Sequence, residues 1–255
     1  MTALLTVDGL DKRYAGIHAV RDLSYTVEAA SITAVIGPNG SGKSTSIDCI
    51  TGFQRPDGGR WYFSGVEMTG RPAYAQSRAG MTRSFQNVRA YGGMSLLESL
   101  LAASQAHDGV GWWSAVRRNA ACRRAEVSAA ERAKELLEAV GLTRYANAPT
   151  EILSYGQSKL LAIAAAMMSS PGLVILDEPV AGVNPTMVRR IEGVIRALNG
   201  QGVTFLIVEH NMPFIMALCE WVIVLENGRK IAEGAPALIR NDQRVLDAYL
   251  GGAAP

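Results

Sequence analysis

The sequence is organised around nine consecutive residues, Gly37-Pro38-Asn39-Gly40-Ser41-Gly42-Lys43-Ser44-Thr45. They fit the phosphate-loop pattern G-x-x-x-x-G-K-[ST], in which Gly37, Gly42, Lys43 and Ser44 occupy the fixed positions. The glycines let backbone N–H groups curl around phosphate oxygens, because no Cβ atom stands in the way. Lys43 can reach the β- and γ-phosphates as a compact cation, and the Ser44 hydroxyl is a suitable ligand for Mg²⁺.

The residues on either side of this loop supply the context that a phosphate loop needs. An apolar run, Ile32 to Ile36, precedes it and predicts a strand, and a helix-like run begins at Lys43. The N-terminus of that helix would face the anion. A chance match to the pattern is expected in roughly one chain in a hundred of this length, from average residue usage. The sequence therefore predicts a site for a nucleoside triphosphate.

Composition and charge narrow the class of function. With 255 residues, of which 48% are hydrophobic and 19% charged, the chain is typical of a globular protein with one substantial core. Its net charge of +2 is too small to indicate nucleic acid as the main ligand. The longest purely apolar run, Leu160 to Met168, is about half of what spans a bilayer. No signal peptide is expected, and the three separated cysteines predict reduced thiols, as in a cytosolic protein.

The N-terminal part predicts two strands, Leu4 to Leu10 and Val20 to Glu28, separated by a polar segment from Asp11 to Ala19. Tyr14 lies in that segment. Its ring could stack on adenine, an interaction worth ~1–3 kcal/mol per base. A half-buried packing role is more common for tyrosine, and the residue alone favours packing about two to one.

Residues from about 95 to 140 have the period of helices. The apolar positions that recur at helical spacing are Leu96, Leu97, Leu100 and Leu101, and then Ala133, Leu136, Leu137 and Val140. Gly141 is expected to cap the second helix. The basic run between them, with Arg117, Arg118, Arg123 and Arg124, favours a solvated helix face over an anionic surface or a partner. We interpret this region as a helical insert between core strands.

A further helix is predicted after the residues Leu153-Ser154-Tyr155-Gly156-Gln157. Ser154 is a suitable N-cap for the apolar run that follows, and Gly156 leaves backbone N–H groups open at the helix start. From the residues alone, this is either an ordinary capped helix or a second anion-binding terminus.

Acidic residues follow a fully apolar strand, Leu173 to Leu176, at Asp177 and Glu178. The carboxyl ends of buried parallel strands are where α/β sheets bind ligands. Asp177 can hold Mg²⁺ directly or through water, and Glu178 can orient or polarise an attacking water. A plain acidic turn is the alternative, but the phosphate loop in the same chain favours the functional role. A second apolar strand, Thr204 to Val208, ends close to His210, where the imidazole could contact a γ-phosphate.

The order of these motifs resembles that of the ATP-binding cassette ATPases of ABC transporters, over essentially the whole chain. The LSYGQ stretch at residues 153–157 is the most diagnostic, because other phosphate-loop families lack it. Residues 83–89 and the tail from Val245 to Gly251 resemble the ATPase subunits of branched-chain amino acid uptake systems. The resemblance implies an α/β, RecA-like phosphate-loop NTPase core with an N-terminal antiparallel β subdomain and an inserted helical subdomain. Residues 1–88 and 170–255 would form the core of this single cassette, and residues 89–169 the insert.

The resemblance also implies a role for individual residues. Tyr14 becomes the adenine-stacking aromatic, which reverses the preference from the residue alone. Mg²⁺ would lie among Ser44, Gln86 and Asp177, and Gln86 would also sense the membrane partner. The catalytic group would consist of Glu178 as the carboxylate, His210 as the γ-phosphate contact, and Gln86.

The LSYGQ residues would serve a second cassette. The resemblance implies that Ser154, Gly156 and Gln157 complete, in trans, the ATP site of a partner subunit. The sequence departs from the common family pattern at Tyr155, which replaces a glycine, and at Asn184, where many cassettes carry Asp.

The implied partners are a second, non-identical cassette ATPase, transmembrane permease subunits, and indirectly an extracytoplasmic substrate-binding protein. The chain would lie in the cytoplasm at the inner face of the membrane, with the permease contact at residues 87–98. The sequence has no evident arginine finger, and a helix N-terminus from a partner would replace it in phosphoryl transfer. The phosphate loop and Ser154 are therefore expected to belong to two different sites.

Three alternatives remain from the sequence. A soluble cassette protein acting in DNA repair or translation is disfavoured by the near-neutral charge and the lack of long coiled-coil heptads. A binding switch with negligible turnover is disfavoured by Glu178 and His210. An export or lipid-transport ATPase is the alternative within transport.

Overall fold

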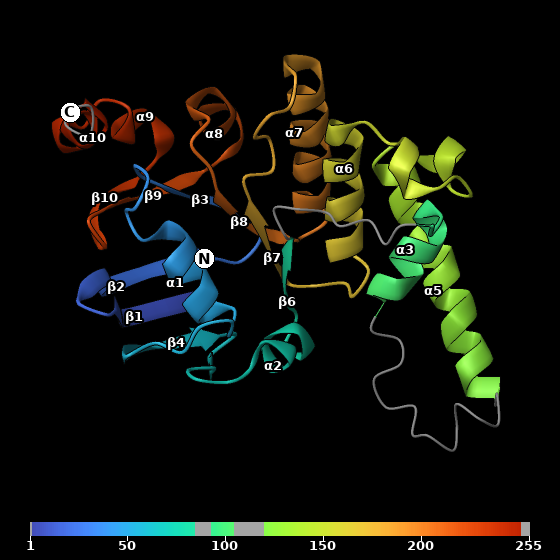
Figure 1. Ribbon diagram of the computed structural model, residues 1–255, viewed down its shortest axis with the longest axis horizontal. Coiled ribbons are helices and arrows are strands. Elements are labelled where there is room, and N and C mark those ends of the chain that lie inside the picture. The colour runs from blue at the N-terminus through green and yellow to red at the C-terminus, as the bar shows by residue number, and fades with distance from the viewer. Residues whose placement is uncertain (1, 85–92, 105–119, 251–255) are drawn as a thin grey trace.

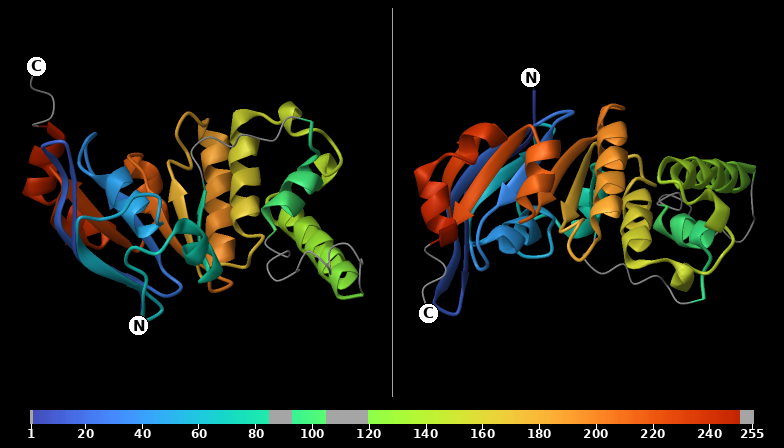
Figure 2. Two further views of the ribbon diagram at one scale, coloured as in Figure 1. Left: turned by 60° about the horizontal axis from the view of Figure 1, so that its bottom comes forward. Right: turned by 90° about the horizontal axis from the view of Figure 1, so that it is seen from above.

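The computed structural model describes residues 2–84, 93–104 and 120–250 (Figure 1). Two sheets of different kinds lie side by side in it, and most of the helices pack around the larger one (Figures 1 and 2). Gln86, Arg117 and Arg118 fall outside the described residues, whereas Arg123 and Arg124 are described and exposed.

The smaller sheet is antiparallel, with the strand order β2-β1-β4-β5. Its strands are β1 (Ala3–Tyr14), β2 (Ile17–Glu28), β4 (Gly58–Phe63) and β5 (Val66–Glu67). The prediction that a polar segment separates the first two strands is wrong, because pairing continues to the turn, with Tyr14 opposite Ile17. Polar side chains stabilise this outer part of the ladder: His18 Nε2 lies 2.7 Å from Asp11 Oδ2.

The larger sheet has the strand order β10-β9-β3-β8-β7-β6. Its strands are β3 (Ile32–Ile36), β6 (Met81–Ser84), β7 (Leu173–Asp177), β8 (Thr204–Val208), β9 (Trp221–Glu226) and β10 (Arg229–Gly234). The strands from β9 to β6 are parallel, and β10 joins β9 as an antiparallel hairpin. Every residue of β3, β7 and β8 is buried, which explains why these strands are continuous apolar runs.

The helices in the described residues are α1 (Lys43–Ile50), α2 (Ala73–Arg78), α3 (Leu96–Ala103), α5 (Ala120–Ala139), α6 (Tyr155–Ala166), α7 (Pro185–Asn199), α8 (Met212–Leu218), α9 (Pro236–Ile239) and α10 (Gln243–Leu250). Short 3₁₀ turns cover Thr143–Tyr145 and Thr150–Ile152. The C-terminal tail is interrupted between two helices, α9 and α10. The interruption is stabilised at Asp242, whose carboxylate accepts from the backbone N–H of Arg244.

The two faces of the larger sheet carry different cores. On one face, Val35 and alternating residues of the other strands pack against the apolar side of α1 and the smaller sheet. On the other face, Ala34 and Ile36 pack in a cluster with residues of α6, α7 and α8. Because side chains alternate along a strand, neighbouring residues of β3 serve opposite cores. Helices α1 and α6 therefore lie on opposite faces of the sheet.

The helical part of the chain packs α3, α5 and α6 against one another. Ser95 caps α3 in a capping box with Glu98. Gly141 follows α5 with a φ of 65°, which confirms the predicted cap, and a Cβ there would meet the Arg190 guanidinium. Helix α6 also packs against β6 and α7, so it belongs to the sheet as much as to the insert.

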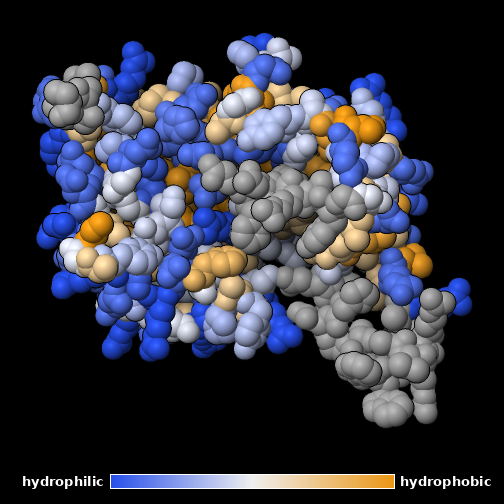
Figure 3. All heavy atoms as spheres, in the orientation of Figure 1, coloured by the Kyte–Doolittle hydropathy of each residue, from blue (hydrophilic) through white to orange (hydrophobic). Residues whose placement is uncertain are grey.

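Hydrophilic side chains cover most of the face seen in Figure 3, and hydrophobic ones gather there in small groups. Within the described residues, no helix combines the length and the apolar character that crossing a membrane requires. Cys49 and Cys219 are buried and free, and burial raises the pKa of their thiols, to about 11 and about 12.

Candidate functional site

The phosphate loop connects β3 to α1, as predicted, and neighbouring backbone crowds its glycines. A Cβ at Gly37 would lie 2.1 Å from the Leu225 carbonyl oxygen, and one at Gly42 would lie 2.4 Å from that of Ala19. Both glycines have positive φ, at 151° and 96°. The β9–β10 turn also holds the loop, because Gly228 N–H donates to the Ser41 carbonyl over 3.1 Å. The loop conformation is thus one that only glycine permits at these two positions.

Lys43 folds back over the loop. Its Nζ donates to the carbonyl oxygens of Gly37 and Pro38 over 2.8 and 2.9 Å. Burial lowers the pKa of Lys43, whereas the charges of Glu178 and Asp177 raise it. The cation and the two acidic residues, far apart in the sequence, are therefore neighbours at the carboxyl ends of the strands, as the sequence predicts.

Asp177 ends β7 and is 8% exposed. Its Oδ2 accepts from the Arg83 Nη2 over 2.8 Å, and the other amine of the same guanidinium donates to Asp48 on α1. These contacts raise the pKa of Arg83 in spite of its burial. Sequence reasoning did not assign Arg83 a role. Arg83 ties three elements together, β6, β7 and α1, directly beside the predicted metal ligand.

Glu178 and His210 are brought together. Oε1 of Glu178 lies 3.8 Å from Nδ1 of His210, and the two side chains are 32% and 62% exposed. Buried Glu209 stabilises the loops that follow β7 and β8, because it accepts from the backbone N–H of Val180 in the first loop and of His210 and Asn211 in the second. Sequence reasoning missed Glu209. A carboxylate with three backbone donors fixes the loop backbone and leaves the neighbouring side chains open to a ligand.

Ser154 lies at the start of α6 and caps it, with its Oγ 3.4 Å from the Gln157 N–H. The Gln157 side chain completes a capping box through the Ser154 N–H. Gly156 has a packing reason, since a Cβ there would lie 2.5 Å from Cγ of Met187 on α7. Asn184 caps α7 through the Met187 N–H. Helix α6 and the phosphate-loop helix occupy opposite sheet faces, and the hydrogen bonds of Ser154 are with Gln157 and Ser158 of its own helix.

Two aromatic residues come from opposite ends of the chain: Tyr14 lies near Cys49 and Asp48 of α1, and Tyr249 contacts the phosphate loop itself. Tyr14, at the end of β1, is 40% exposed, and the Lys12 Nζ lies 5.2 Å from its ring centre. Burial raises the pKa of Tyr249 on α10, and a hydrogen bond with the Gly37 backbone opposes that rise. Tyr249 appears in the sequence only as part of the C-terminal run, so its contact with the phosphate loop was not predicted.

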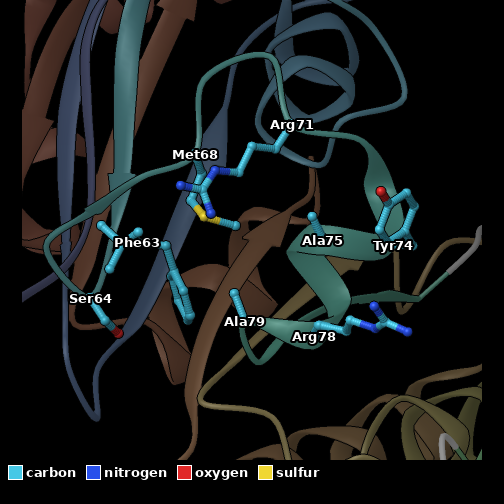
Figure 4. Close-up of a pocket in the computed structure, with 9 residues that line it drawn as sticks. Phe63, Ser64, Met68, Arg71, Tyr74, Ala75, Arg78 and Ala79 are labelled. Carbon is cyan, nitrogen blue, oxygen red and sulfur yellow. The ribbon is translucent and has the colours of Figure 1, made fainter. Parts of the chain in front are cut away.

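The donor set fits a nucleotide with Mg²⁺. A backbone cradle that any Cβ at Gly37 or Gly42 would fill is suited to phosphate oxygens. The Ser44 hydroxyl and the Asp177 carboxylate are hard oxygen donors, and Mg²⁺ at nucleotides is usually held by one or two such groups together with phosphates and water. A separate hollow of about 450 Å³ between the β4–β5 hairpin and α2 contains none of these residues (Figure 4).

Comparison with known proteins assigns this arrangement to a family. The family model described as ABC transporter matches residues 20–181, which include the phosphate loop, the LSYGQ stretch and the acidic strand end. The chain belongs to the ABC transporter family. A second model, described as Branched-chain amino acid ATP-binding cassette transporter, matches residues 229–255.

Relatives of this ABC cassette match it from end to end. The branched-chain amino acid transport ATP-binding protein BraF of Pseudomonas aeruginosa is 39% identical over 98% of both chains. LivG of Escherichia coli K12, with the same description, is 37% identical over the same share. These relatives support the transporter ATPase interpretation over the soluble and export alternatives, and ATP hydrolysis is the activity characteristic of the family.

Solved structures confirm the fold. A nucleotide-free ATP-binding cassette from an ABC transporter is 32% identical, with a TM-score of 0.85 over 97% of this chain and 99% of that one. A cassette in its ADP conformation is 30% identical, with a TM-score of 0.86 over 98% and 100%. The predicted α/β phosphate-loop NTPase fold is thus confirmed.

Proposed function

We propose that this cassette is the ATP-hydrolysing subunit of an importer for branched-chain or other hydrophobic amino acids. The full-length relatives BraF and LivG are described as high-affinity branched-chain amino acid transport proteins, which supports this substrate class. The C-terminal family match, which covers residues 229–255, supports the same assignment.

The observation that carries the mechanism is the placement of α1 and α6 on opposite faces of the larger sheet. Each ATP would be held between Lys43 of one subunit and Ser154 of another, an arrangement supported by the different sheet faces on which the helices of these two residues lie. The exposed N-terminus of α6 would then direct N–H groups at the γ-phosphate of the partner's ATP. The proposed natural partner is a related, non-identical cassette, and the pair would lie on permease subunits at the inner membrane face. The permeases would receive substrate from an extracytoplasmic binding protein.

Within one site, each residue has a distinct task. Tyr14 would stack on adenine, and residues 37–45 would hold the phosphates. Ser44, Asp177 and Gln86 would hold Mg²⁺, which neutralises charge on the phosphates. Glu178 would orient and polarise water, and His210 would contact the γ-phosphate. Closure of two cassettes around ATP and their reopening after hydrolysis would form the two-state switch that drives the permease.

The composite site predicts rescue between two damaged chains. A Lys43→Ala chain and a Ser154→Ala chain should each be nearly inactive, and their mixture should regain ATPase activity at the one site with both groups intact. The unmodified chain should hydrolyse ATP slowly, with activity rising more than linearly with protein concentration, because dimerisation is required. Measurement of phosphate release against concentration and mixing ratio tests both expectations.

Two results would contradict this arrangement. One is full-speed hydrolysis that is strictly linear in the concentration of dilute monomer. The other is a mixture whose activity equals the sum of its parts, although each variant folds and the unmodified chain dimerises.

The substrate class predicts a transport phenotype. A strain that lacks this chain should lose most high-affinity uptake of labelled leucine, isoleucine or valine, and the unmodified gene should restore it. A Glu178→Gln copy should not restore uptake, since that chain is expected to bind ATP without turnover. Uptake of labelled lysine is the matched control, because its cationic side chain does not fit a hydrophobic amino acid pathway. Unchanged leucine, isoleucine and valine uptake in the deletion strain would refute the substrate assignment.

A further inference from the structure

Lys159 is an unusual residue, because lysine is almost never buried without a partner. It lies in the second turn of α6 and is 5% exposed, the only buried lysine or arginine within the part of the chain that the structure describes. Its Nζ donates to the backbone carbonyl of Glu178 over 3.0 Å. A buried cation therefore contacts the backbone of the residue that carries the proposed catalytic carboxylate.

The Glu178 backbone needs such support. Its φ of 48° lies in the left-handed region, which a residue other than glycine adopts only when its surroundings determine it. On one side, the Glu178 N–H donates to the Val208 carbonyl of β8 over 2.9 Å. On the other side, the carbonyl accepts from Lys159, and from the Ala181 N–H at 3.4 Å. The peptide groups are held from both sides, while the carboxylate remains 32% exposed.

The same helix contacts the rest of the loop that follows Glu178. A Cβ at Gly182 would lie 3.4 Å from the Tyr155 ring, and the Lys159 Nζ lies 5.4 Å from the centre of that ring. Ser154, the proposed contact to the partner's ATP, starts this helix. Lys159 thus connects two parts of the proposed composite sites. One is α6, whose N-terminus would contact the partner's ATP, and the other is the Glu178 carboxylate, which would act on the ATP of its own chain.

We propose that Lys159 is a positioning residue that couples the two ATP sites. Its bond to the Glu178 carbonyl holds the catalytic carboxylate of its own chain in place. Because Lys159 belongs to α6, the position of that carboxylate depends on where the α6 N-terminus lies on the partner's ATP. This inference rests on the proposed composite site. The Lys159 ammonium is buried and bonded to the Glu178 carbonyl, so its effect is expected on turnover and not on nucleotide affinity.

The first test compares Lys159→Met with Lys159→Arg in the full chain. Methionine keeps the length and packing of the side chain without a donor, and arginine keeps a cationic donor. Lys159→Met is expected to lower kcat about tenfold or more, as misplacement of a catalytic group does, with ATP affinity changed less than about twofold. Lys159→Arg should recover most of kcat. Unchanged kcat in Lys159→Met, or no recovery in a folded Lys159→Arg chain, would overturn the proposal.

The second test locates the effect within the dimer. In a mixture of Lys43→Ala and Ser154→Ala chains, the complete site uses Lys43 and Glu178 of the Ser154→Ala chain. Lys159→Met in that chain should lower the activity of the mixture about tenfold, whereas in the Lys43→Ala chain it should cost about twofold or less. Equal losses in both placements would indicate a general packing role and overturn the proposal. Failure of the parent mixture to recover activity would count against the composite site, and the first test would still decide the role of Lys159.

Discussion

Replacement of Glu178 by Gln is expected to stop ATP turnover while ATP binding stays intact. The amide keeps the shape of the side chain and removes the carboxylate, and a general base typically contributes about 10²–10⁴-fold to rate. With chemistry blocked after binding, ATP and Mg²⁺ should trap a dimer. Phosphate release measures the turnover, and size-exclusion chromatography with ATP and Mg²⁺ measures the trapped dimer.

Glu233→Gln is a matched control for this experiment. Its side chain is 37% exposed, close to the 32% of Glu178, and it makes a surface ion pair with Lys230 on β10. Loss of such a pair costs about 0–1 kcal/mol of stability, so turnover should be normal. Unchanged turnover in Glu178→Gln, or elution only as a monomer with ATP and Mg²⁺, would remove Glu178 from its proposed role.

Replacement of Lys43 by Ala is expected to abolish tight ATP binding. The Lys43 ammonium already lies on the loop, where it donates to the carbonyls of Gly37 and Pro38, and it can exchange these contacts for phosphate oxygens. A charge-assisted hydrogen bond is worth up to about 3 kcal/mol, which corresponds to a loss on the order of 100-fold in affinity. The carboxylates of Asp177 and Glu178, left without this cation, would add to the loss by repelling the phosphates.

Calorimetric titration with ATP measures this loss. Lys134→Ala, which removes an exposed lysine of α5, makes the same change in net charge far from the loop and should bind normally. Near-normal affinity of Lys43→Ala would refute the phosphate-loop assignment.

The same titration tests whether Tyr14 stacks on the base. Tyr14→Ala should weaken ATP binding by ~1–3 kcal/mol and Tyr14→Phe only slightly, since stacking needs a π-face. Equal damage from both Tyr14 variants would refute stacking.

Much of the site could be predicted from the sequence because its parts are local. Residues 37–45 form one loop, and their glycines are recognisable because backbone approach excludes a side chain. Asp177 and Glu178 directly follow a buried strand, so their place at the sheet edge follows from the strand itself. Gln86 was also predicted, but it lies outside the described residues, and its role stays a prediction.

Other predictions failed or were missing because they depend on pairing between distant segments. The polar ends of β1 and β2 looked like a loop, and their pairing across a tight turn made them strand. Arg83 contacts Asp177, 94 residues away in sequence. Glu209 reaches the N–H of Val180, 29 residues away. No local pattern marks either residue, since a lone arginine or glutamate most often lies on the surface.

The sequence by itself determined the chemistry of this cassette: a phosphate loop, an acidic strand end and a capped helix at LSYGQ, each written in adjacent residues. Only the tertiary structure decided how they combine. The order of the six strands places β3 between β9 and β8, and alternation along each strand sends α1 to one face and α6 to the other. Backbone geometry is local, whereas strand order and the choice of face depend on the burial of the whole apolar surface. That choice puts the helices that begin at Lys43 and after Ser154 on different faces, and it brings Lys159 to the Glu178 backbone.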